Sequence, residues 1–115
     1  MKVLYVENHA VFASNVIREF LAQHTVKVSP SLSEARDALR SAEFDLLLVD
    51  FDLDDGKGDE LVRELRDLGW EVPIIAASSH DQGNQALLRA GANAVCAKMD
   101  FGRIQNVIAT VVTMN

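Results

Sequence analysis

Short apolar runs alternate with segments of helical periodicity along the whole chain. The runs occupy residues 3–6, 25–28, 46–49, 72–77 and 94–97. Runs that are apolar on both faces are typical of strands in a parallel sheet covered on both sides. Apolar residues spaced three and four apart predict helices in the gaps, over 12–21, 32–42, 61–68, 86–90 and 104–111.

This order of elements, strand then helix five times, predicts the fold class. Strict alternation indicates an α/β domain whose parallel strands are joined by right-handed crossovers. Five such units fit the flavodoxin-like five-stranded parallel sheet, with strand order 2-1-3-4-5 and helices on both faces. We expect one domain over residues 1–115. In this fold the ligand crevice lies at the carboxyl ends of the strands, near the first and third.

Composition and charge narrow the classes of protein and partner. Apolar residues make up 49% and charged residues 24%, as in an ordinary globular domain. A net charge of −6 disfavours a general nucleic-acid surface and is compatible with a bound divalent cation or a basic partner. The single cysteine, Cys96, and the lack of an apolar run near the ~20 residues of a membrane span lead us to expect a cytoplasmic protein.

Polar side chains follow four of the five predicted strands. Glu7 and Asn8 follow the first, Asp50 the third, Ser78 the fourth and Lys98 the fifth. Each alone is explained as well by a turn, a helix cap or a solvated charge. Together they are harder to dismiss, because the carboxyl ends of parallel strands meet at one edge of the sheet.

The residue types at this edge suit phosphoryl transfer. Asp50 is a carboxylate nucleophile that can form an acyl phosphate. Phosphoryl transfer needs charge neutralisation and positioning, which Mg²⁺ held by one or two carboxylates supplies. Lys98 can pair with a phosphoryl oxygen, and the Ser78 hydroxyl can donate a hydrogen bond to another.

The set resembles the site of the response-regulator receiver domains of two-component signalling. The segments FDLLLVDFDLDDGKG, VPIIAASS and RAGANAVCAK carry the resemblance, and Gly58 matches a glycine common after the acceptor. The resemblance implies a phosphoprotein switch: Asp50 accepts phosphate from a sensor histidine kinase or phosphotransfer protein, assisted by Ser78 and Lys98. It implies Mg²⁺ at Glu7, Asn8 and Asp50, to which we add Asp52 as a further candidate ligand. It also implies no enzymatic activity beyond slow self-dephosphorylation, and an output partner at the fourth helix, fifth strand and fifth helix.

Three positions depart from the family pattern. Asn8 replaces the second acid after the first strand, and we expect Asp52 to restore the missing negative charge near the metal. Met99 replaces the proline that usually follows the lysine, so we expect a trans peptide bond there. Val95 stands where many members carry an aromatic switch residue, so we expect output without an aromatic rotation.

Other functions remain open at this point. A degenerate receiver that no longer accepts phosphate would act as a protein-interaction module, and Asn8 and Met99 favour this alternative. A haloacid-dehalogenase-like phosphatase would share the motif of Asp50 and Asp52, but it wants Thr or Val where Asp54 stands. A calcium loop requires Gly sixth and Glu twelfth, where this chain has Asp55 and Leu61, and is rejected.

Overall fold

The computed structural model describes residues 1–113 and has the predicted alternation of strands and helices. The last two residues of the domain expected over 1–115 lie outside the described residues. In chain order the elements are β1 (Lys2–Val6), α1 (Ala10–Phe20), β2 (Thr25–Ser29), α2 (Leu32–Ser41), β3 (Leu46–Val49), β4 (Asp52–Leu53), β5 (Gly56–Lys57), α3 (Gly58–Asp67), β6 (Ile74–Ala76), α4 (Asp81–Ala90), β7 (Ala94–Val95), the 3-10 helix η1 (Lys98–Arg103) and α5 (Ile104–Thr113).

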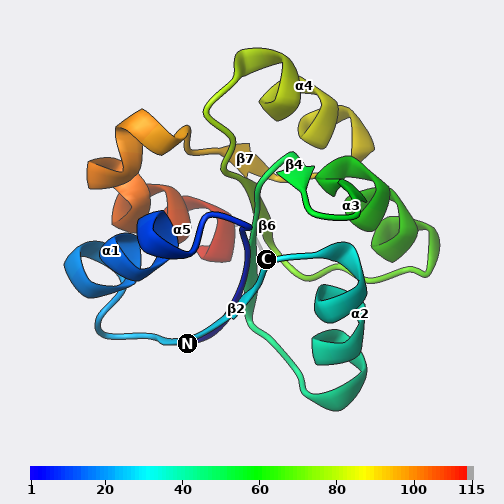
Figure 1. Cartoon of the computed structure of the whole chain (residues 1–115), viewed down its shortest axis with the longest axis horizontal. Helices are drawn as coiled ribbons and strands as arrows, with labels where there is room; N and C mark the ends of the chain where they lie inside the picture. The colour runs from blue at the N-terminus through cyan, green and yellow to red at the C-terminus, as the bar shows by residue number, and fades with distance from the viewer. Residues whose placement is uncertain (114–115) are drawn as a thin grey trace.

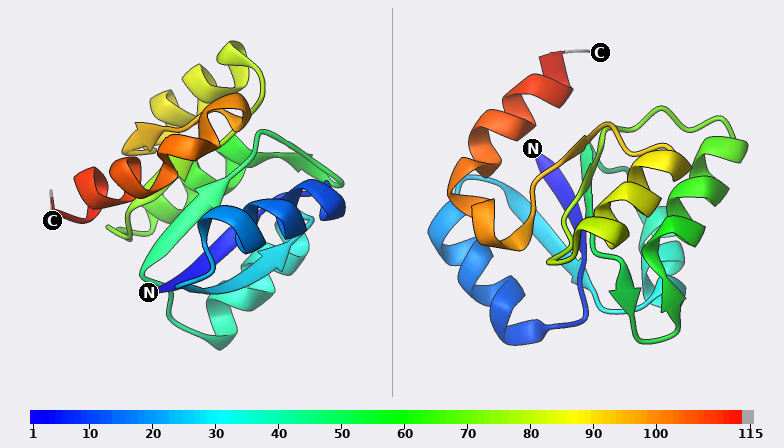
Figure 2. Two further views of the ribbon diagram at one scale, coloured as in Figure 1. Left: turned by 90° about the vertical axis from the view of Figure 1, so that its left-hand side faces the viewer. Right: turned by 90° about the horizontal axis from the view of Figure 1, so that it is seen from above.

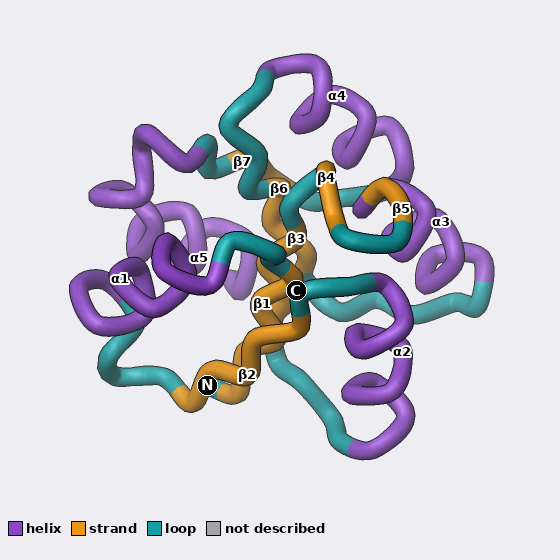
Figure 3. Tube along the Cα trace, in the orientation of Figure 1, coloured by secondary structure: helices purple, strands orange, loops and turns teal. Residues whose placement is uncertain are grey.

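Five of the strands form one parallel sheet in the order β2-β1-β3-β6-β7. This is the predicted 2-1-3-4-5 order, since β6 and β7 are the fourth and fifth strands of that sheet. The register pairs Val6 with Val49 and Val49 with Ala76, so the carboxyl ends of the three central strands are level. Figure 3 shows these strands at the centre of the molecule, with helices around them.

Two layers of helices cover the sheet. Helices α1 and α5 lie on one face, and α2, α3 and α4 lie on the other (Figures 1 and 2). The side chains of β1 alternate between the two cores: Val3 and Tyr5 pack under α1 and α5, whereas Leu4 and Val6 pack under the other three helices. This alternation explains why the central strands are apolar on both faces. In the described part of the chain, no helix is long and apolar enough to cross a membrane.

The ends of the helices follow local sequence signals. At the start of α2 the Ser31 hydroxyl accepts a hydrogen bond from the Glu34 backbone N–H at 3.1 Å, as expected of a serine in the N-cap position. Gly69 and Gly91 adopt positive φ angles of 85° and 128° directly after α3 and α4, which suits glycine best. The last two strands of the sheet are shorter than predicted: β6 begins after Pro73, and β7 contains two residues.

A small antiparallel hairpin, β4–β5, occupies the segment after Asp50, to which the sequence analysis assigned neither a strand nor a helix. Its tip rests on the N-terminus of α2, where Asp55 accepts hydrogen bonds from the backbone N–H groups of Leu32 at 2.6 Å and Ser33 at 3.0 Å. These bonds satisfy donors that a helix leaves unpaired at its start. The segment that carries Asp50 is therefore anchored to α2.

We expect Asp55→Ala to lower the melting temperature, because α2 loses this cap. The two backbone hydrogen bonds lower the pKa of Asp55. A carboxylate with a depressed pKa stabilises the fold above its unfolded value of about 3.9 and loses that effect as the pH falls through the folded value. The difference between parent and variant should therefore be full at pH 7 and shrink in acid. Thermal unfolding at pH 7 and in acid measures this difference between the parent and Asp55→Ala. Glu43→Ala, at an exposed position, should show no such pH-dependent difference.

Candidate functional site

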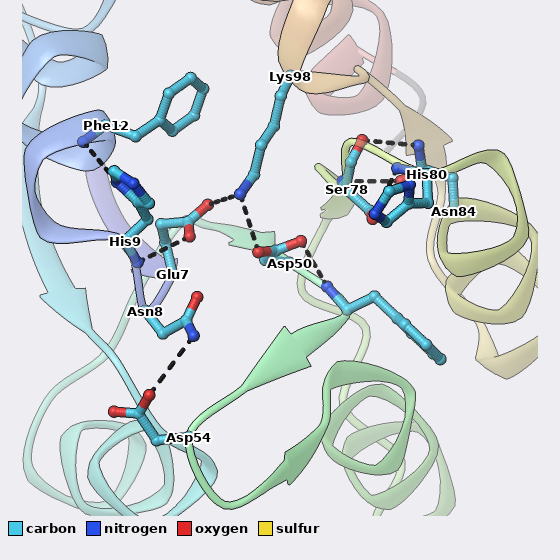
Figure 4. A network of polar contacts seen from close by, with 11 residues as sticks. Glu7, Asn8, His9, Phe12, Asp50, Asp54, Ser78, His80, Asn84 and Lys98 are labelled. Atoms are coloured by element: carbon cyan, nitrogen blue, oxygen red, sulfur yellow. Dashed lines mark hydrogen bonds and ion pairs between the residues drawn. The ribbon is translucent and has the colours of Figure 1, made fainter.

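The sheet brings the predicted site residues to one edge. Asp50 follows β3, and its backbone N–H donates to the Val6 carbonyl of β1 at 2.9 Å. Lys98 follows β7 and Ser78 follows β6, on the side of β3 away from β1, and the Lys98 N–H donates to the Ser78 carbonyl at 3.3 Å. Glu7 immediately follows β1. Four segments that are distant in the sequence therefore converge at the carboxyl ends of the strands (Figure 4).

Lys98 joins the two buried carboxylates of the site. Its ammonium Nζ lies 2.8 Å from Glu7 Oε1 and 3.0 Å from Asp50 Oδ2. The exposed fractions of these side chains are 0% for Glu7, 7% for Asp50 and 18% for Lys98. Burial raises the pKa of Glu7, and the nearby Asp50 charge adds to that rise while Lys98 opposes it. Burial alone would lower the pKa of Lys98, but its bonds to Glu7 and Asp50 outweigh burial and raise it.

Further contacts fix the positions of Asp50 and Lys98. The second Asp50 oxygen, Oδ1, accepts a hydrogen bond from the Phe51 N–H at 2.7 Å. The Lys98 ammonium lies 5.0 Å from the centre of the Phe12 ring, within the range of a cation–π interaction. Asp50 is thus a preorganised carboxylate beside a fixed positive charge, which is the arrangement that an incoming phosphoryl group requires.

Ser78 lies on the opposite side of Asp50 from Glu7 (Figure 4). It is buried, and its hydroxyl oxygen accepts a hydrogen bond from the His80 N–H at 3.1 Å. The Asn84 amide fixes its backbone: Asn84 Oδ1 accepts from the Ser78 N–H at 2.9 Å, and Asn84 Nδ2 donates to the Ser78 carbonyl at 3.0 Å. Asn84 was not among the residues selected from the sequence, although an asparagine on the buried face of a helix is itself a signal of a polar partner.

Replacing Asn84 with alanine is expected to lower the free energy of unfolding by about 1–3 kcal/mol, because the buried Ser78 N–H loses its partner and the Ser78 carbonyl keeps only the longer bond from the Lys98 N–H. Chemical denaturation measures this change. Gln85→Ala, at the next position of α4 but exposed, is the matched control and should remain within about 0.5 kcal/mol of the parent. Equal effects of the two substitutions would show that the Asn84 bonds contribute no more than ordinary helix propensity.

Asn8 and Asp52 both contact residues that the sequence analysis did not link to them. Asn8 is exposed, and its Nδ2 donates to Asp54 Oδ1 at 3.4 Å, which leaves the amide oxygen facing the crevice (Figure 4). Asp52 lies on β4 with 54% of its side chain exposed and forms an ion pair with Lys57. The expectation that Asp52 points into the crevice is therefore not supported by its contacts. The acid that contacts Asn8 is Asp54.

His9 has a role that the sequence did not indicate. Its backbone N–H donates to Glu7 Oε2 at 3.0 Å, and its ring Nδ1 accepts a hydrogen bond from the Phe12 N–H at 3.2 Å at the start of α1. His9 therefore caps α1 and helps to hold the Glu7 carboxylate. Histidine is not among the preferred capping residues, so the sequence pattern did not predict the hydrogen bond between the His9 ring and the Phe12 N–H.

The oxygen atoms at this edge fit a hard divalent cation only in part. Mg²⁺ prefers one or two carboxylates together with phosphate oxygens and water. Asp50 and the Asn8 amide oxygen are suitable ligands. Lys98 pairs with both Asp50 and Glu7, but the Glu7 carboxylate is in addition fully buried. Among residues 1–113, no cluster of three or more His, Cys, Asp or Glu side chains forms a metal site. The set therefore fits a cation that a phosphoryl group helps to hold.

Comparison with known proteins agrees with this geometry. Residues 3–109 match the family of the response regulator receiver domain. Response regulator protein PilR of Pseudomonas aeruginosa is 32% identical over 87 residues, which cover 73% of this chain and 20% of PilR. This chain thus spans about a fifth of that relative's length.

Solved structures show the same fold at low sequence identity. The receiver domain of the Francisella response regulator 1452 has a TM-score of 0.86 at 18% identity, covering 98% of this chain and 97% of that one. A Burkholderia pseudomallei response regulator, solved with a phosphorylated aspartic acid, a calcium ion and citrate, has a TM-score of 0.79 at 20% identity, covering 96% and 65%. The sheet order, the convergent edge and the match over most of the chain establish that this protein belongs to the response regulator receiver domain family.

Proposed function

We propose that the domain is a phosphoacceptor switch in which Asp50 receives a phosphoryl group from a phosphohistidine of a sensor kinase or phosphotransfer protein. The observation that carries the proposal is the nearly buried Asp50 carboxylate, held 3.0 Å from the Lys98 ammonium at the carboxyl edge of the sheet. The phosphorylated aspartic acid in the Burkholderia pseudomallei relative supports it. A cytoplasmic location, expected from the single cysteine, is part of the same proposal.

In the transfer step an Asp50 carboxylate oxygen forms a bond to phosphorus, and the bond from phosphorus to the donor nitrogen breaks. The electron pair of that bond stays with the donor imidazole. Lys98 neutralises charge on the phosphoryl oxygens, since its Nζ already lies beside Asp50 Oδ2. The Ser78 hydroxyl, which has a proton to donate, can form a hydrogen bond to a phosphoryl oxygen after a small movement of its loop.

Asp50 and the Asn8 amide oxygen would hold Mg²⁺, with Glu7 available only if Lys98 moves towards the phosphate. When bound, the cation supplies further positive charge to the phosphoryl oxygens. The Asn8 amide oxygen carries no full charge, so this domain should bind Mg²⁺ more weakly than a receiver with two acids after its first strand. Asp52 is left out of this set because Lys57 pairs with its carboxylate.

The exposed apolar rim of the crevice is the place where we propose that the phosphodonor docks. Val11, on the first turn of α1, is 67% exposed, and Met99, next to Lys98, is 94% exposed.

The output partner is proposed at α4, β7 and α5. Val95 lies in that region and has no ring to rotate, so Ser78 and the start of α4 would transmit the change. The competing function is that of a receiver domain that is not phosphorylated and acts as a protein-interaction module. Asn8, which stands in place of an acid, favours this alternative.

Intact-mass measurement tests this function. After incubation with Mg²⁺ and a small phosphodonor, we expect one phosphoryl adduct that hydroxylamine removes, since acyl phosphates react with this nucleophile. Asp50→Asn should give no adduct, whereas Asp52→Asn should retain it. Failure of the parent chain to form an adduct with either a small donor or a phosphorylated histidine protein would support the phosphorylation-independent interaction module instead.

A further inference from the structure

A groove between α2 and α3 is separate from the Asp50 crevice. Its volume is about 260 Å³, and its floor and one end are apolar, made of Leu39, Leu61, Leu65, Leu68 and Trp70. Two of these side chains project into solvent, with exposed fractions of 67% for Leu68 and 40% for Trp70. Figure 1 shows the two helices side by side on the face of the sheet away from α1 and α5. Exposed leucine and tryptophan beside an apolar groove are typical of an interaction surface.

The two walls of the groove carry opposite charges. Arg36 and Arg40 line it on α2, and Glu64 lines it on α3. Arg36 Nε lies 2.9 Å from Glu64 Oε2, so these two residues are at the same level along the groove. About one turn further along each helix are Arg40, with 70% of its side chain exposed, and the exposed Asp67. Two ion pairs lie within single helices near this level: Arg40 pairs with Asp37 at 2.6 Å on α2, and Arg63 pairs with Asp59 at 3.2 Å on α3. Asp67 has no ion-pair partner among the described residues.

From this pattern we infer that the α2–α3 groove is an interface between two copies of this chain. A twofold axis along the groove places α2 of one copy opposite α3 of the other, so that each basic wall faces an acidic wall. Arg40 of each copy then lies opposite Asp67 of its partner, on either side of the twofold axis. The guanidinium group has several N–H donors, so it can bind Asp67 of the partner while it keeps its ion pair with Asp37. A peptide of one charge sign would match one wall and be repelled by the other. The charge pattern therefore favours a second copy over such a peptide.

The apolar and charged parts of the surface have separate roles in this dimer. Leu68 and Trp70 of each copy cover the leucines of the other, which removes apolar area from water. Large aromatic and apolar anchors supply most of the affinity of such contacts, while the charges at the rim fix the orientation. None of these residues belongs to the Asp50 site, so the unphosphorylated chain should form the dimer. Whether the chain dimerises through this groove is therefore independent of whether Asp50 is phosphorylated.

Sedimentation equilibrium of the unphosphorylated chain over a range of concentrations is the first test. We expect a monomer–dimer equilibrium, and Leu68→Glu should weaken the dimer by about tenfold or more, since a charge replaces an apolar anchor. Circular dichroism should show that this variant stays folded, because Leu68 is mainly exposed. Arg18→Gln, which changes the net charge by the same one unit at an exposed position of α1, should dimerise like the parent. A parent chain that is monomeric at every concentration, or a Leu68→Glu dimer of parental affinity, overturns the inference.

A charge exchange tests the proposed orientation. Arg40→Glu and Asp67→Lys should each weaken self-association, because each places like charges opposite one another at both ends of the contact. An equimolar mixture should form a heterodimer, since Glu at position 40 of one copy then faces Lys at position 67 of the other and the second pair is unchanged. If the mixture stays as dissociated as the separate variants, the twofold arrangement is wrong.

Discussion

Replacing Lys98 with methionine is expected to lower the free energy of unfolding by about 3–5 kcal/mol, the usual cost of removing one partner from a buried ionic group. Lys98 contacts both Glu7 at 2.8 Å and Asp50 at 3.0 Å. Without the ammonium group, two carboxylates with almost no exposure face each other. Methionine keeps most of the apolar length of the side chain, so the change measures charge and hydrogen bonding more than packing.

The matched control is Lys57→Met. Lys57 forms an ion pair with Asp52, but more than half of each side chain is exposed. An exposed pair contributes about 1 kcal/mol or less, so this substitution should change stability little. Urea denaturation of both variants without divalent cations measures the difference, and similar losses for the two lysines would contradict a buried ionic site.

The effect of Lys98→Met should also depend on pH. Burial raises the pKa of Glu7 above its unfolded value, and Lys98 is the group that opposes this rise. A group with a raised pKa stabilises the fold below its unfolded pKa and loses that contribution as the pH rises through the folded value. The deficit of the variant should therefore be largest at neutral pH and smaller near pH 5. Glu7→Gln introduced beside Lys98→Met should recover part of the loss.

Gly58→Ala is expected to lower the free energy of unfolding by about 3 kcal/mol or more, because no space exists for a side chain. A Cβ at this position would lie 2.0 Å from the Asp50 carbonyl oxygen and 2.9 Å from Val49 Cγ1. The backbone on both sides of the acceptor would have to move, so phosphorylation of Asp50 should fall as well. Gly58 is therefore required by the close approach of α3 to the strand that carries Asp50.

Gly102→Ala is the matched control for Gly58→Ala. No described heavy atom outside its own neighbourhood lies within 4 Å of a Cβ at position 102, and its φ angle is negative. Its stability should stay within about 0.5 kcal/mol of the parent. Thermal unfolding of the two variants, with an assay of the phosphoryl adduct, makes the comparison. A Gly58→Ala protein as stable as Gly102→Ala would show that α3 is not packed against Asp50 as described.

The fold was predictable because its signals are local and repeated. Apolar runs such as 46–49 are buried on both faces, and the strict alternation of strands with helices leaves few possible topologies. The β4–β5 hairpin was not predictable in this way. Its strands contain two residues each, and its position depends on Asp55 reaching the start of α2. Contacts of this kind join residues more than 20 positions apart and leave no periodic pattern.

The same distinction applies to the site. Strand topology alone brought Glu7, Asp50 and Lys98 to one edge, and the structure places their side chains in contact. The direction of a side chain within an irregular loop was not predictable. Asp52 and Asp54 both follow Asp50 closely, yet the partner of Asp52 is Lys57 and that of Asp54 is Asn8. Sequence spacing could not distinguish them, because the turn of the hairpin decides which carboxylate approaches the crevice.

The most direct test of the central claim is to locate the phosphorylated residue. Borohydride reduces an aspartyl phosphate to homoserine, and tandem mass spectrometry of the peptide spanning the β3 end and the hairpin can then distinguish positions 50, 52, 54 and 55. We expect homoserine at position 50 alone, and only after treatment with a phosphodonor. Homoserine at position 52 or 54, or its absence from a chain that carries the phosphoryl adduct, would contradict the assignment of Asp50 as the acceptor.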